Sequence, residues 1–466
     1  MPFENKLKNI PPEAYVSDLL KIRSFDVAET GNIVGNFSKI AERGLLSPIR
    51  KGSGPFMLRT QISPPERKLS ELVGRKAIGI DIGGTNLRMS IGEIDGDGHM
   101  KPIGKIKSEE IPVEYDSLDD FFEMLLNNGL GNLLKENPGL PVACIFSFPG
   151  TGIETGNGID IIMRGNMPKG WHIDGSEGKK LGEELNKFLQ GKDDELKKKK
   201  LPLDKRPFGQ REYFIDNDTV ALIQNNDDFG IVCASGYNWS MVIKKNKLGE
   251  SRKEHGKTII NSEAGQAAVA PRIPVITEKL LENIAKEEEK PVDQVPLRDE
   301  YQVSGKYLGR TLGLVVDELR NEYNLFTSAK NTIFPKSFIV SEILENNWDK
   351  VKERFNTQVD FNEKEQNILV QIASALRDRS AQIVADHLIA LWQTGCPEKN
   401  RLRISSDGPI IQHMPGWKEK FMEEINFVTQ NQLKIKIRET SYQGKTRDFR
   451  GIFDVMGQAI EYFNRK

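Results

Sequence analysis

The strongest candidates for chemistry are the acidic residues that follow an apolar run near position 215. β-Prone residues at 213–215 lead into Asp216, Asn217 and Asp218, where we expect a helix to begin. Ligands of α/β folds collect at the carboxyl ends of strands, where a carboxylate beside a hydroxyl and a metal-bound phosphate can accept a proton during phosphoryl transfer. Helix capping by Asp216 or Asn217 explains the same pattern, so this segment alone supports two interpretations.

A glycine turn between two apolar runs is a second candidate, for binding phosphate. Residues 76–94 predict two strands that are joined by a Gly-Gly-Thr-Asn turn at 83–86. Glycine lets backbone amides approach a phosphate closely. Asp81 would then need a nearby divalent cation, and Arg88 could neutralise terminal phosphate oxygens. A plain hairpin is the alternative.

Short polar residues that interrupt apolar segments form a third set of candidates. A sugar site needs neutral and anionic acceptors for hydroxyl donors, held on several loops. A surface loop explains each of these residues individually. The set contains residues 147–149, 166–169 and 261–263 with Glu300.

The remaining pattern predicts a chain of alternating strands and helices. The strand–turn–strand units at 76–94 and 228–246 are a weak internal duplication, which indicates two related α/β halves facing one cleft. The long apolar stripe of the helix at 365–392 is expected to be core. Further predictions are helices at 13–22, 36–46, 117–135, 177–189, 416–426 and 451–463, strands at 141–148, 401–407 and 433–440, and an irregular segment at 149–178.

Length and composition indicate an ordinary globular protein of two or three domains. The chain has 466 residues, with Lys+Arg 66 and Asp+Glu 67, so its formal net charge of -1 makes nucleic acid a poor partner. Its three cysteines are far apart and cannot form a disulfide framework or a compact zinc site, which indicates a reducing compartment. We find no signal peptide and no run of the ~18 apolar residues that a membrane span needs, and therefore expect a cytoplasmic protein.

Taken in order, these segments resemble the hexokinase family of the actin-like ATPase superfamily. The resemblance extends from about Pro55 to the C-terminus. It implies an α/β, two-domain actin-like ATPase (ribonuclease H-like) fold hinged around a cleft. The similar segments are IDIGGTNLRMS at 80–90, FSFP at 146–149, NMPKG at 166–170, IDNDTVALI at 215–223, ASGYNWSM at 234–241, INSEAG at 260–265, EYQVSGKYLGR at 300–310 and SSDGP at 405–409.

The resemblance also implies a role for each matched residue. Asp218 would be the general base, Lys169 would neutralise charge near the transferred group, and Asp81 and Asp218 would hold Mg²⁺ mostly through water. The hexose would contact Ser147, Phe148, Pro168, Lys169, Asn217, Asp218, Asn238, Glu263 and Glu300. The phosphoryl donor, ATP, would contact Asp81, Gly83, Gly84, Thr85, Asn86, Arg88, Ser235, Gly236, Arg379, Asp407 and Gly408.

The sequence departs from the family pattern mainly on the nucleotide side. Pro168 stands where the family has threonine, Ala264 replaces a tryptophan, and Asp378 replaces a threonine that contacts the nucleotide. Ala234 and Pro409 replace a glycine and a serine. The glycine-rich adenosine motif is missing, since residues 443–454 read QGKTRDFRGIFD.

Two alternatives follow from these departures. One is a sugar sensor that binds hexose but has weak or no catalysis, and the other is a kinase with a different phosphoryl donor or sugar. The related bacterial repressor–kinase family is disfavoured, because its cysteine-rich zinc motif is absent. We expect a small domain at 76–217 with 448–466 and a large domain at 1–75 with 218–447. The sequence predicts no particular oligomeric state or preferred hexose.

Overall fold

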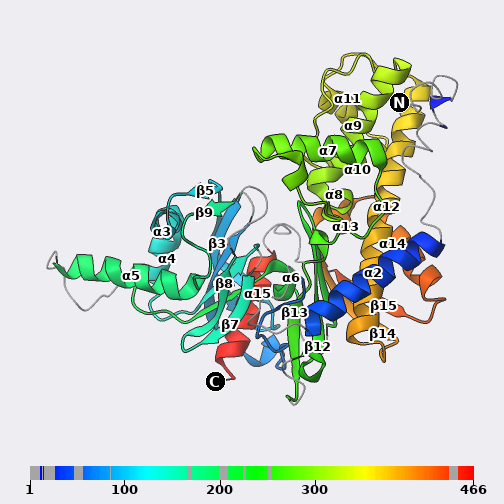
Figure 1. The fold of residues 1–466 in the computed structure, drawn as a ribbon. Coiled ribbons are helices and arrows are strands. Elements are labelled where there is room, and N and C mark those ends of the chain that lie inside the picture. The colour runs from blue at the N-terminus through cyan, green and yellow to red at the C-terminus, as the bar shows by residue number, and fades with distance from the viewer. Residues whose placement is uncertain are drawn as a thin grey trace.

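The fold consists of two lobes, each built around one mixed β-sheet (Figure 1). No helix among the residues described is long and apolar enough to cross a membrane. Of the helix predicted at 13–22, only Ala14 lies among those residues, whereas the one predicted at 36–46 is the second half of α2 (Val27–Leu46). The computed structural model describes residues 27–46, 56–83, 86–148, 150–164, 171–198, 208–223, 227–249, 254–439 and 450–465, together with Pro11, Pro12 and Ala14.

The first lobe contains a seven-stranded sheet in the order β4-β3-β2-β6-β10-β8-β7. Strands β2, β3 and β4 are antiparallel, and β2, β6 and β10 are parallel, which confirms the strands predicted at 76–94 and 141–148. A short pair, β5 with β9, lies beside this sheet. The strands are β2 (Lys76–Ile82), β3 (Asn86–Ile94), β4 (Met100–Glu110), β5 (Glu114–Tyr115), β6 (Val142–Phe146), β7 (Gly150–Thr155), β8 (Gly158–Met163), β9 (His172–Ile173) and β10 (Tyr213–Asp216).

The second lobe repeats the same topology in a six-stranded sheet of order β1-β13-β12-β11-β14-β15. Three antiparallel strands are again followed by two parallel ones, so β13-β12-β11-β14-β15 corresponds to β4-β3-β2-β6-β10. The predicted internal duplication is therefore confirmed at the level of topology. The strands are β1 (Leu58–Arg59), β11 (Phe229–Cys233), β12 (Tyr237–Lys244), β13 (Lys257–Asn261), β14 (Arg401–Asp407) and β15 (Lys434–Glu439).

The prediction of an irregular segment at 149–178 was wrong. This segment contains the β7–β8 hairpin and strand β9. Its many glycines suggested a loop, but they allow close backbone contacts instead. A Cβ atom on Gly152 would lie 2.1 Å from the Thr60 carbonyl oxygen, and Gly158 has φ +135° with the Tyr213 carbonyl oxygen in the place of a side chain.

The single helix predicted at 117–135 is divided into two. Helix α3 (Leu118–Leu125) and helix α4 (Gly131–Glu136) are joined by a π-helical turn. Gly129 within that turn has φ 124°, which is outside the helical range. The apolar periodicity continued across the turn, so it did not reveal the interruption.

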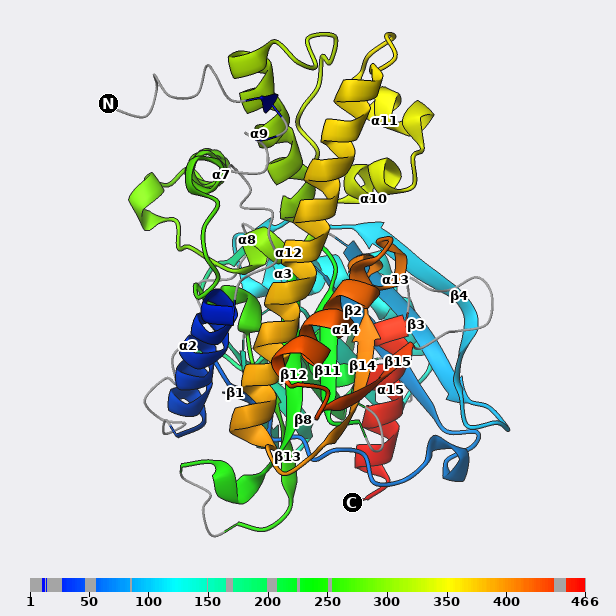
Figure 2. The same ribbon diagram turned by 90° about the vertical axis from the view of Figure 1, so that its right-hand side faces the viewer.

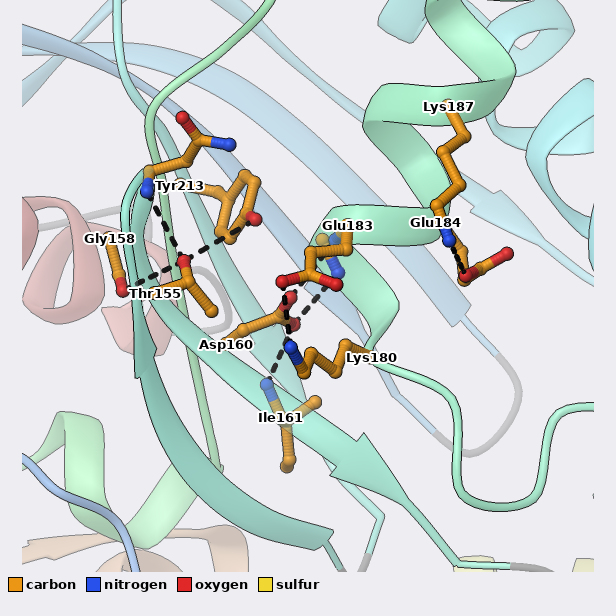
Figure 3. Close-up of polar contacts among 11 residues, drawn as sticks. Thr155, Gly158, Asp160, Ile161, Lys180, Glu183, Glu184, Lys187 and Tyr213 are labelled. Carbon is orange, nitrogen blue, oxygen red and sulfur yellow. Dashed lines mark hydrogen bonds and ion pairs between the residues drawn. The ribbon is translucent and has the colours of Figure 1, made fainter.

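A buried carboxylate attaches the β7–β8 hairpin to helix α5 (Leu181–Lys198). The Asp160 side chain is fully buried and accepts hydrogen bonds from the backbone amides of Ile161, Gly182 and Glu183, at 2.7 to 2.9 Å (Figure 3). Because Gly182 and Glu183 lie in the first turn of α5, Asp160 satisfies amides that have no partner within the helix. This fixes strand β8, which Arg164 directly follows.

The 33-residue helix α12 (Glu363–Gly395) runs through the second lobe, with α2 and α14 packed along it (Figure 2). It begins with a capping box between Asn362 and Glu365, and its predicted apolar stripe is buried, as expected for core. The other helices are α7 (Pro274–Glu287), α8 (Glu300–Val303), α9 (Gly305–Tyr323), α10 (Phe338–Leu344), α11 (Trp348–Phe355), α13 (Pro409–His413), α14 (Trp417–Val428) and α15 (Arg450–Phe463).

Between the two sheets lies the short helix α6 (Asp218–Ala221), beside α15 (Figure 1). From the second sheet, the Ser240 hydroxyl donates to the Thr219 carbonyl at 2.7 Å. From α15, the Gln458 amide donates to the Val220 carbonyl at 3.0 Å. The helix that begins with Asp218 is thus held from both sides.

Candidate active site

The residues at the junction of β10 and α6 are fixed by local hydrogen bonds. Asn217 is the N-cap of α6, and its side-chain oxygen accepts from the backbone amide of Thr219 at 3.1 Å and from its hydroxyl at 2.8 Å. Asp218 is half-buried and also accepts from the Thr219 amide, at 2.8 Å. Asn217 therefore caps helix α6. Asp218 is the first residue of that helix and lies just beyond the end of strand β10.

Asp216, just before this cap, is a buried carboxyl group with one unsatisfied oxygen. Its Oδ1 accepts from the Asn217 amide at 2.7 Å, whereas its Oδ2 has no hydrogen-bond partner among the described residues. Burial raises the pKa of Asp216 well above its ordinary value; the Asn217 amide opposes this and the charge of Asp218 adds to it. The sequence analysis named Asp216 in the acidic cluster and as a possible helix cap, and gave it no specific role.

Glu263 and Glu300 come from the second lobe, and Glu263 lies near both Asp218 and Glu300. Burial raises the pKa of Glu263 to about 7, hydrogen bonds from Asn261 and Gln266 oppose the shift, and the charges of Asp218 and Glu300 add to it. Glu263 is 8% exposed and has φ 54°, while Glu300, also 8% exposed, begins α8. Three carboxyl groups from separate segments thus form one group, here called the acidic triad (Asp218, Glu263 and Glu300).

Two asparagines hold the loop that carries Glu263. The Asn238 side-chain amide donates to Asn261 Oδ1 at 2.7 Å, and the Asn261 amide donates to Glu263 Oε1 at 2.8 Å. Asn238 Oδ1 in turn accepts from the Ala264 backbone amide at 3.2 Å. The structure therefore brings Asn238 into the same hydrogen-bonded network as the acidic triad. Asn261 was noted in the sequence only as part of a polar segment.

From the first lobe, Ser147 and Phe148 follow β6 directly. The Ser147 amide donates to the Ile82 carbonyl at 3.2 Å. Phe148 is fully buried, with its ring centroid 4.4 Å from that of Trp171 and 4.9 Å from that of Phe146. Aromatic packing therefore holds Trp171 against Phe148. The predicted Asn166, Pro168 and Lys169 lie outside the described residues.

Arg164, at the end of β8, was missed by the sequence analysis. It is half-buried, and burial lowers its pKa while the charge of Glu263 opposes that shift. A cation of the first lobe therefore lies close to a carboxyl group of the second. No sequence signal identified it, because it stands in the segment predicted to be irregular.

The ends of β2 and β14 bring two more carboxyl groups together from the two lobes. Arg88 pairs with Asp81 across the β2–β3 hairpin and donates to its carboxylate at 2.8 Å. Burial raises the pKa of Asp81; Arg88 opposes the shift and the charge of Asp407 adds to it. Gly83 donates its amide to the Asn86 carbonyl at 2.9 Å, which closes the turn. Gly84 and Thr85 lie outside the described residues.

The second predicted phosphate turn joins β11 to β12. The carbonyl of Ala234 accepts from the Gly305 amide at 2.6 Å, and that of Ser235 accepts from the Ser304 hydroxyl at 3.0 Å, so the turn rests on the start of α9. Ser235 is exposed, and Gly236 is half-buried. Both carbonyl groups of this turn therefore accept hydrogen bonds from the start of α9.

Gly408 follows Asp407, and the backbone conformation at this position requires a glycine. It has φ +113°, and a Cβ atom there would lie 2.3 Å from the Cys233 carbonyl oxygen. Its amide donates to Asp407 Oδ1 at 2.8 Å, and the Gln412 side chain donates to the same oxygen at 3.0 Å. The turn after β14 is therefore held next to the β11–β12 turn.

Arg379 makes its described contacts within the second lobe. Its guanidinium donates to Gln302 Oε1 at 2.7 Å and to the Pro271 carbonyl, and burial lowers its pKa to about 10. The neighbouring Asp378 accepts from Arg377 at 2.7 Å, so its charge is partly compensated. The contact of Arg379 with a nucleotide stays a prediction.

This arrangement defines a two-lobed α/β protein of the actin-like ATPase fold, with carboxyl groups where the ends of the two sheets meet. Two solved structures share the fold over almost their whole length. A hexokinase of Schistosoma mansoni complexed with glucose has a TM-score of 0.71 and 16% identity and covers 96% of this chain and 98% of its own. A second structure, also described as a hexokinase, has a TM-score of 0.70 and 16% identity, with 97% and 99% covered.

Sequence comparison gives the family. Two family models, each described as hexokinase, match residues 16–225 and 228–444. The chain is 24% identical to hexokinase-2 of Candida albicans over 75% of this chain and 73% of the relative. It is 22% identical to hexokinase-2 of Schizosaccharomyces pombe, with 75% and 77% covered. The chain therefore belongs to the hexokinase family of sugar kinases, as the sequence motifs predicted.

Proposed function

We propose that this protein transfers the terminal phosphoryl group of ATP to the 6-hydroxyl of a hexose, with Asp218 as general base. The acidic triad is the observation that carries the proposal. Asp218 lies at the end of the first sheet, and Glu263 of the second lobe lies near enough to feel the charges of both Asp218 and Glu300. Two of these carboxylates can accept hydrogen bonds from sugar hydroxyls, while the third accepts a proton.

The sugar would lie between the lobes, among groups that accept hydrogen bonds. Glu263, Glu300, Asn217 and Asn238 would orient its hydroxyls, and Ser147 with the backbone at Phe148 would contact it from the first lobe. Pro168 and Lys169 would complete the site, with Lys169 neutralising charge near the transferred group. Asn217 and Asn238 are already held by hydrogen bonds, so little freedom is lost when they bind a ligand.

The nucleotide phosphates would bind at the β2–β3 and β11–β12 turns, near the point where Asp81 and Asp407 approach each other. Backbone amides at residues 83–86 and 235–236 and the Arg88 guanidinium would contact the phosphate oxygens. Asp407 and Gly408 lie beside the β11–β12 turn and would contact the same phosphates. We retain Arg379 as a predicted nucleotide contact, although binding ATP there would require it to exchange its bonds with Gln302 and Pro271.

The carboxyl groups at this junction fit a magnesium ion. Asp81 and Asp407 approach each other from the two lobes, and a buried oxygen of Asp216 has no hydrogen-bond partner among the described residues. Oxygen donors of this kind suit Mg²⁺, which would be held by Asp81 and Asp218 mostly through water. When bound, the ion supplies positive charge that offsets the charge developing on the transferred phosphoryl group.

The chain's own residues account for the remaining steps. Asp218 takes the proton from the sugar 6-hydroxyl, and Asn217 and Ser240 keep α6, which carries Asp218, in place. We propose that residues 76–217 with 448–466 move as one domain against 1–75 with 218–447 when sugar binds. Such closure would exclude water that competes as an acceptor. We also infer that the protein acts in the cytoplasm, since its cysteines are buried free thiols.

The proposal is tested by measuring turnover with a panel of sugars and phosphoryl donors. We expect hexose 6-phosphate to form from ATP with Mg²⁺, and slower turnover with GTP, ADP or polyphosphate. Hexose binding without turnover by any donor would instead identify a sugar sensor. Faster turnover with another donor would show that the altered segment at 443–454 has changed the donor.

A further inference from the structure

A buried hydrogen-bond chain connects helix α12 to Asp299, the residue that precedes Glu300 and α8. The Trp239 indole donates to the Tyr237 hydroxyl at 2.8 Å, and that hydroxyl lies 3.0 Å from His387 Nδ1. His387 Nε2 lies 3.2 Å from Asp299 Oδ2. None of these four side chains is more than 4% exposed, and the His387 ring stacks on Phe37 of α2 with centroids 4.2 Å apart.

The donors and acceptors of this chain can be assigned from its chemistry. Indole nitrogen only donates, so the Tyr237 oxygen accepts that bond and directs its own proton to His387 Nδ1. Burial raises the pKa of Tyr237 well above its ordinary value, which keeps this proton in place. His387 then carries its ring proton on Nε2 and donates it to Asp299. The chain therefore has one direction, from Trp239 to Asp299.

Asp299 uses its carboxylate to hold the loop that follows Glu263. Its oxygens accept from the Val269 amide at 3.1 Å and from the Ala270 amide at 3.0 Å. Its own amide donates to the Ala267 carbonyl. The side chain and the backbone amide of Asp299 thus together hold three residues of the segment between Glu263 and α7.

The hydrogen-bond chain also contacts Glu300. Asp299 immediately precedes Glu300, and the Glu300 carboxylate accepts from the backbone amide of Tyr237 at 3.3 Å. Tyr237 therefore takes part twice, through its hydroxyl at one end of the chain and through its amide at the other. Gly265 packs between them, because a Cβ atom there would lie 2.3 Å from the Tyr237 carbonyl oxygen and 3.4 Å from Glu300 Cβ.

We infer that Tyr237, His387 and Asp299 are positioning residues that set the Glu300 carboxylate and the Glu263 loop for hexose binding. This rests on the proposed function, in which both glutamates bind the sugar. A buried polar chain costs more to form than an apolar core of the same shape, and one use of such a chain is to specify a single arrangement. The arrangement specified here includes two carboxyl groups of the acidic triad.

The test is a mutant cycle on hexose affinity with Glu300. Tyr237→Phe removes only the hydroxyl and keeps the amide that binds Glu300, whereas His387→Phe keeps a ring against Phe37 but removes both nitrogens. We expect each variant to raise the hexose dissociation constant about tenfold, because small displacements of binding groups are costly. The KM for ATP should change less than about twofold, since the donor contacts lie on other turns.

The Glu300→Gln background separates positioning from loss of core stability. If the chain acts through Glu300, adding Tyr237→Phe or His387→Phe to Glu300→Gln should weaken hexose binding little further, whereas independent effects would add. The control is Asp193→Asn, which changes a buried carboxylate that accepts from the Phe208 and Gly209 amides in the first lobe. It should lower the melting temperature and leave hexose affinity unchanged.

Three results would overturn the inference, and they can be distinguished from one another. Unchanged hexose affinity in Tyr237→Phe and His387→Phe, with a clear loss in Glu300→Gln, would overturn this inference alone. Unchanged affinity in Glu300→Gln would overturn it together with the proposed role of Glu300. Effects of His387→Phe that add fully to those of Glu300→Gln would also contradict it. If His387→Phe does not fold, the milder Tyr237→Phe decides the outcome.

Discussion

Hexose affinity should depend on pH through the ionisation of Glu263. Burial raises the pKa of this group from 4.5 to about 7, so near neutral pH a large fraction of the free protein carries the protonated form. Sugar hydroxyls donate to a carboxylate, whereas a carboxylic acid has lost part of its accepting capacity. We therefore expect hexose to bind the ionised form and to lose affinity as the pH falls below 7.

The size of the effect follows from the pKa. Below 7 the ionised fraction falls about tenfold per pH unit, which corresponds to about 1.4 kcal/mol of binding free energy per unit. The dissociation constant should thus rise about tenfold between pH 8 and pH 6. The stability of the free protein should change in the opposite direction, because a raised pKa means that folding retains a proton between pH 4.5 and 7. The contribution of Glu263 to stability is therefore lost as the pH rises through that window.

Calorimetry of hexose binding between pH 5.5 and 8.5, without nucleotide, is the measurement. Glu263→Gln cannot titrate at this position, so it should bind more weakly than the unmodified protein and show a flat profile. Calorimetry at pH 6.5 in buffers of different ionisation enthalpy counts the protons released when hexose binds. We expect about three quarters of a proton from Glu263 in the unmodified protein and none from this position in Glu263→Gln. A flat profile in the unmodified protein, or an unaltered one in Glu263→Gln, would refute this reasoning.

Three further substitutions test other parts of the structure. Glu300→Ala should weaken hexose binding roughly ten- to a hundredfold, since a charged hydrogen bond is worth about 1.5–3 kcal/mol, and unchanged affinity in calorimetry would return Glu300 to a structural role. Asp378→Thr should improve the KM for ATP by up to about fivefold, a small gain because Arg377 already pairs with Asp378; steady-state kinetics without any gain would show that Asp378 lies away from the phosphates. Gly408→Ala should cost about 1–3 kcal/mol of unfolding free energy, because φ is +113° and the Cys233 carbonyl fills the Cβ position, and an unaltered denaturation midpoint would contradict this.

The sequence predicted most elements of the fold because its strands and long helices carry regular apolar patterns. The two strand–turn–strand units and the stripe of α12 were identified in this way and lie where they were expected. The β7–β8 hairpin was missed because its glycines, which permit close backbone contacts, resemble those of a loop. Composition alone cannot distinguish these two uses of glycine.

The candidate site was harder to predict from the sequence, because its contacts join segments that are distant along the chain. Motifs identified Asp218, Glu263 and Glu300 individually, and only the fold brings them together. Arg164 beside Glu263, and His387 beside Asp299 across 88 positions of sequence, had no signal at all. The direction of the Arg379 side chain also depends on its packing against α8, which a motif does not specify.

The central claim is that Asp218 removes the proton from a hexose 6-hydroxyl during phosphoryl transfer. Its most direct test is the rate of hexose 6-phosphate formation from ATP, followed by phosphorus NMR, in the unmodified protein and in Asp218→Ala. Loss of a general base is worth about 10²–10⁴-fold, so we expect the variant to lose at least 99% of the rate while hexose affinity in calorimetry stays largely intact. A variant that kept more than about a tenth of the rate, well above what loss of a general base permits, would contradict the role of Asp218.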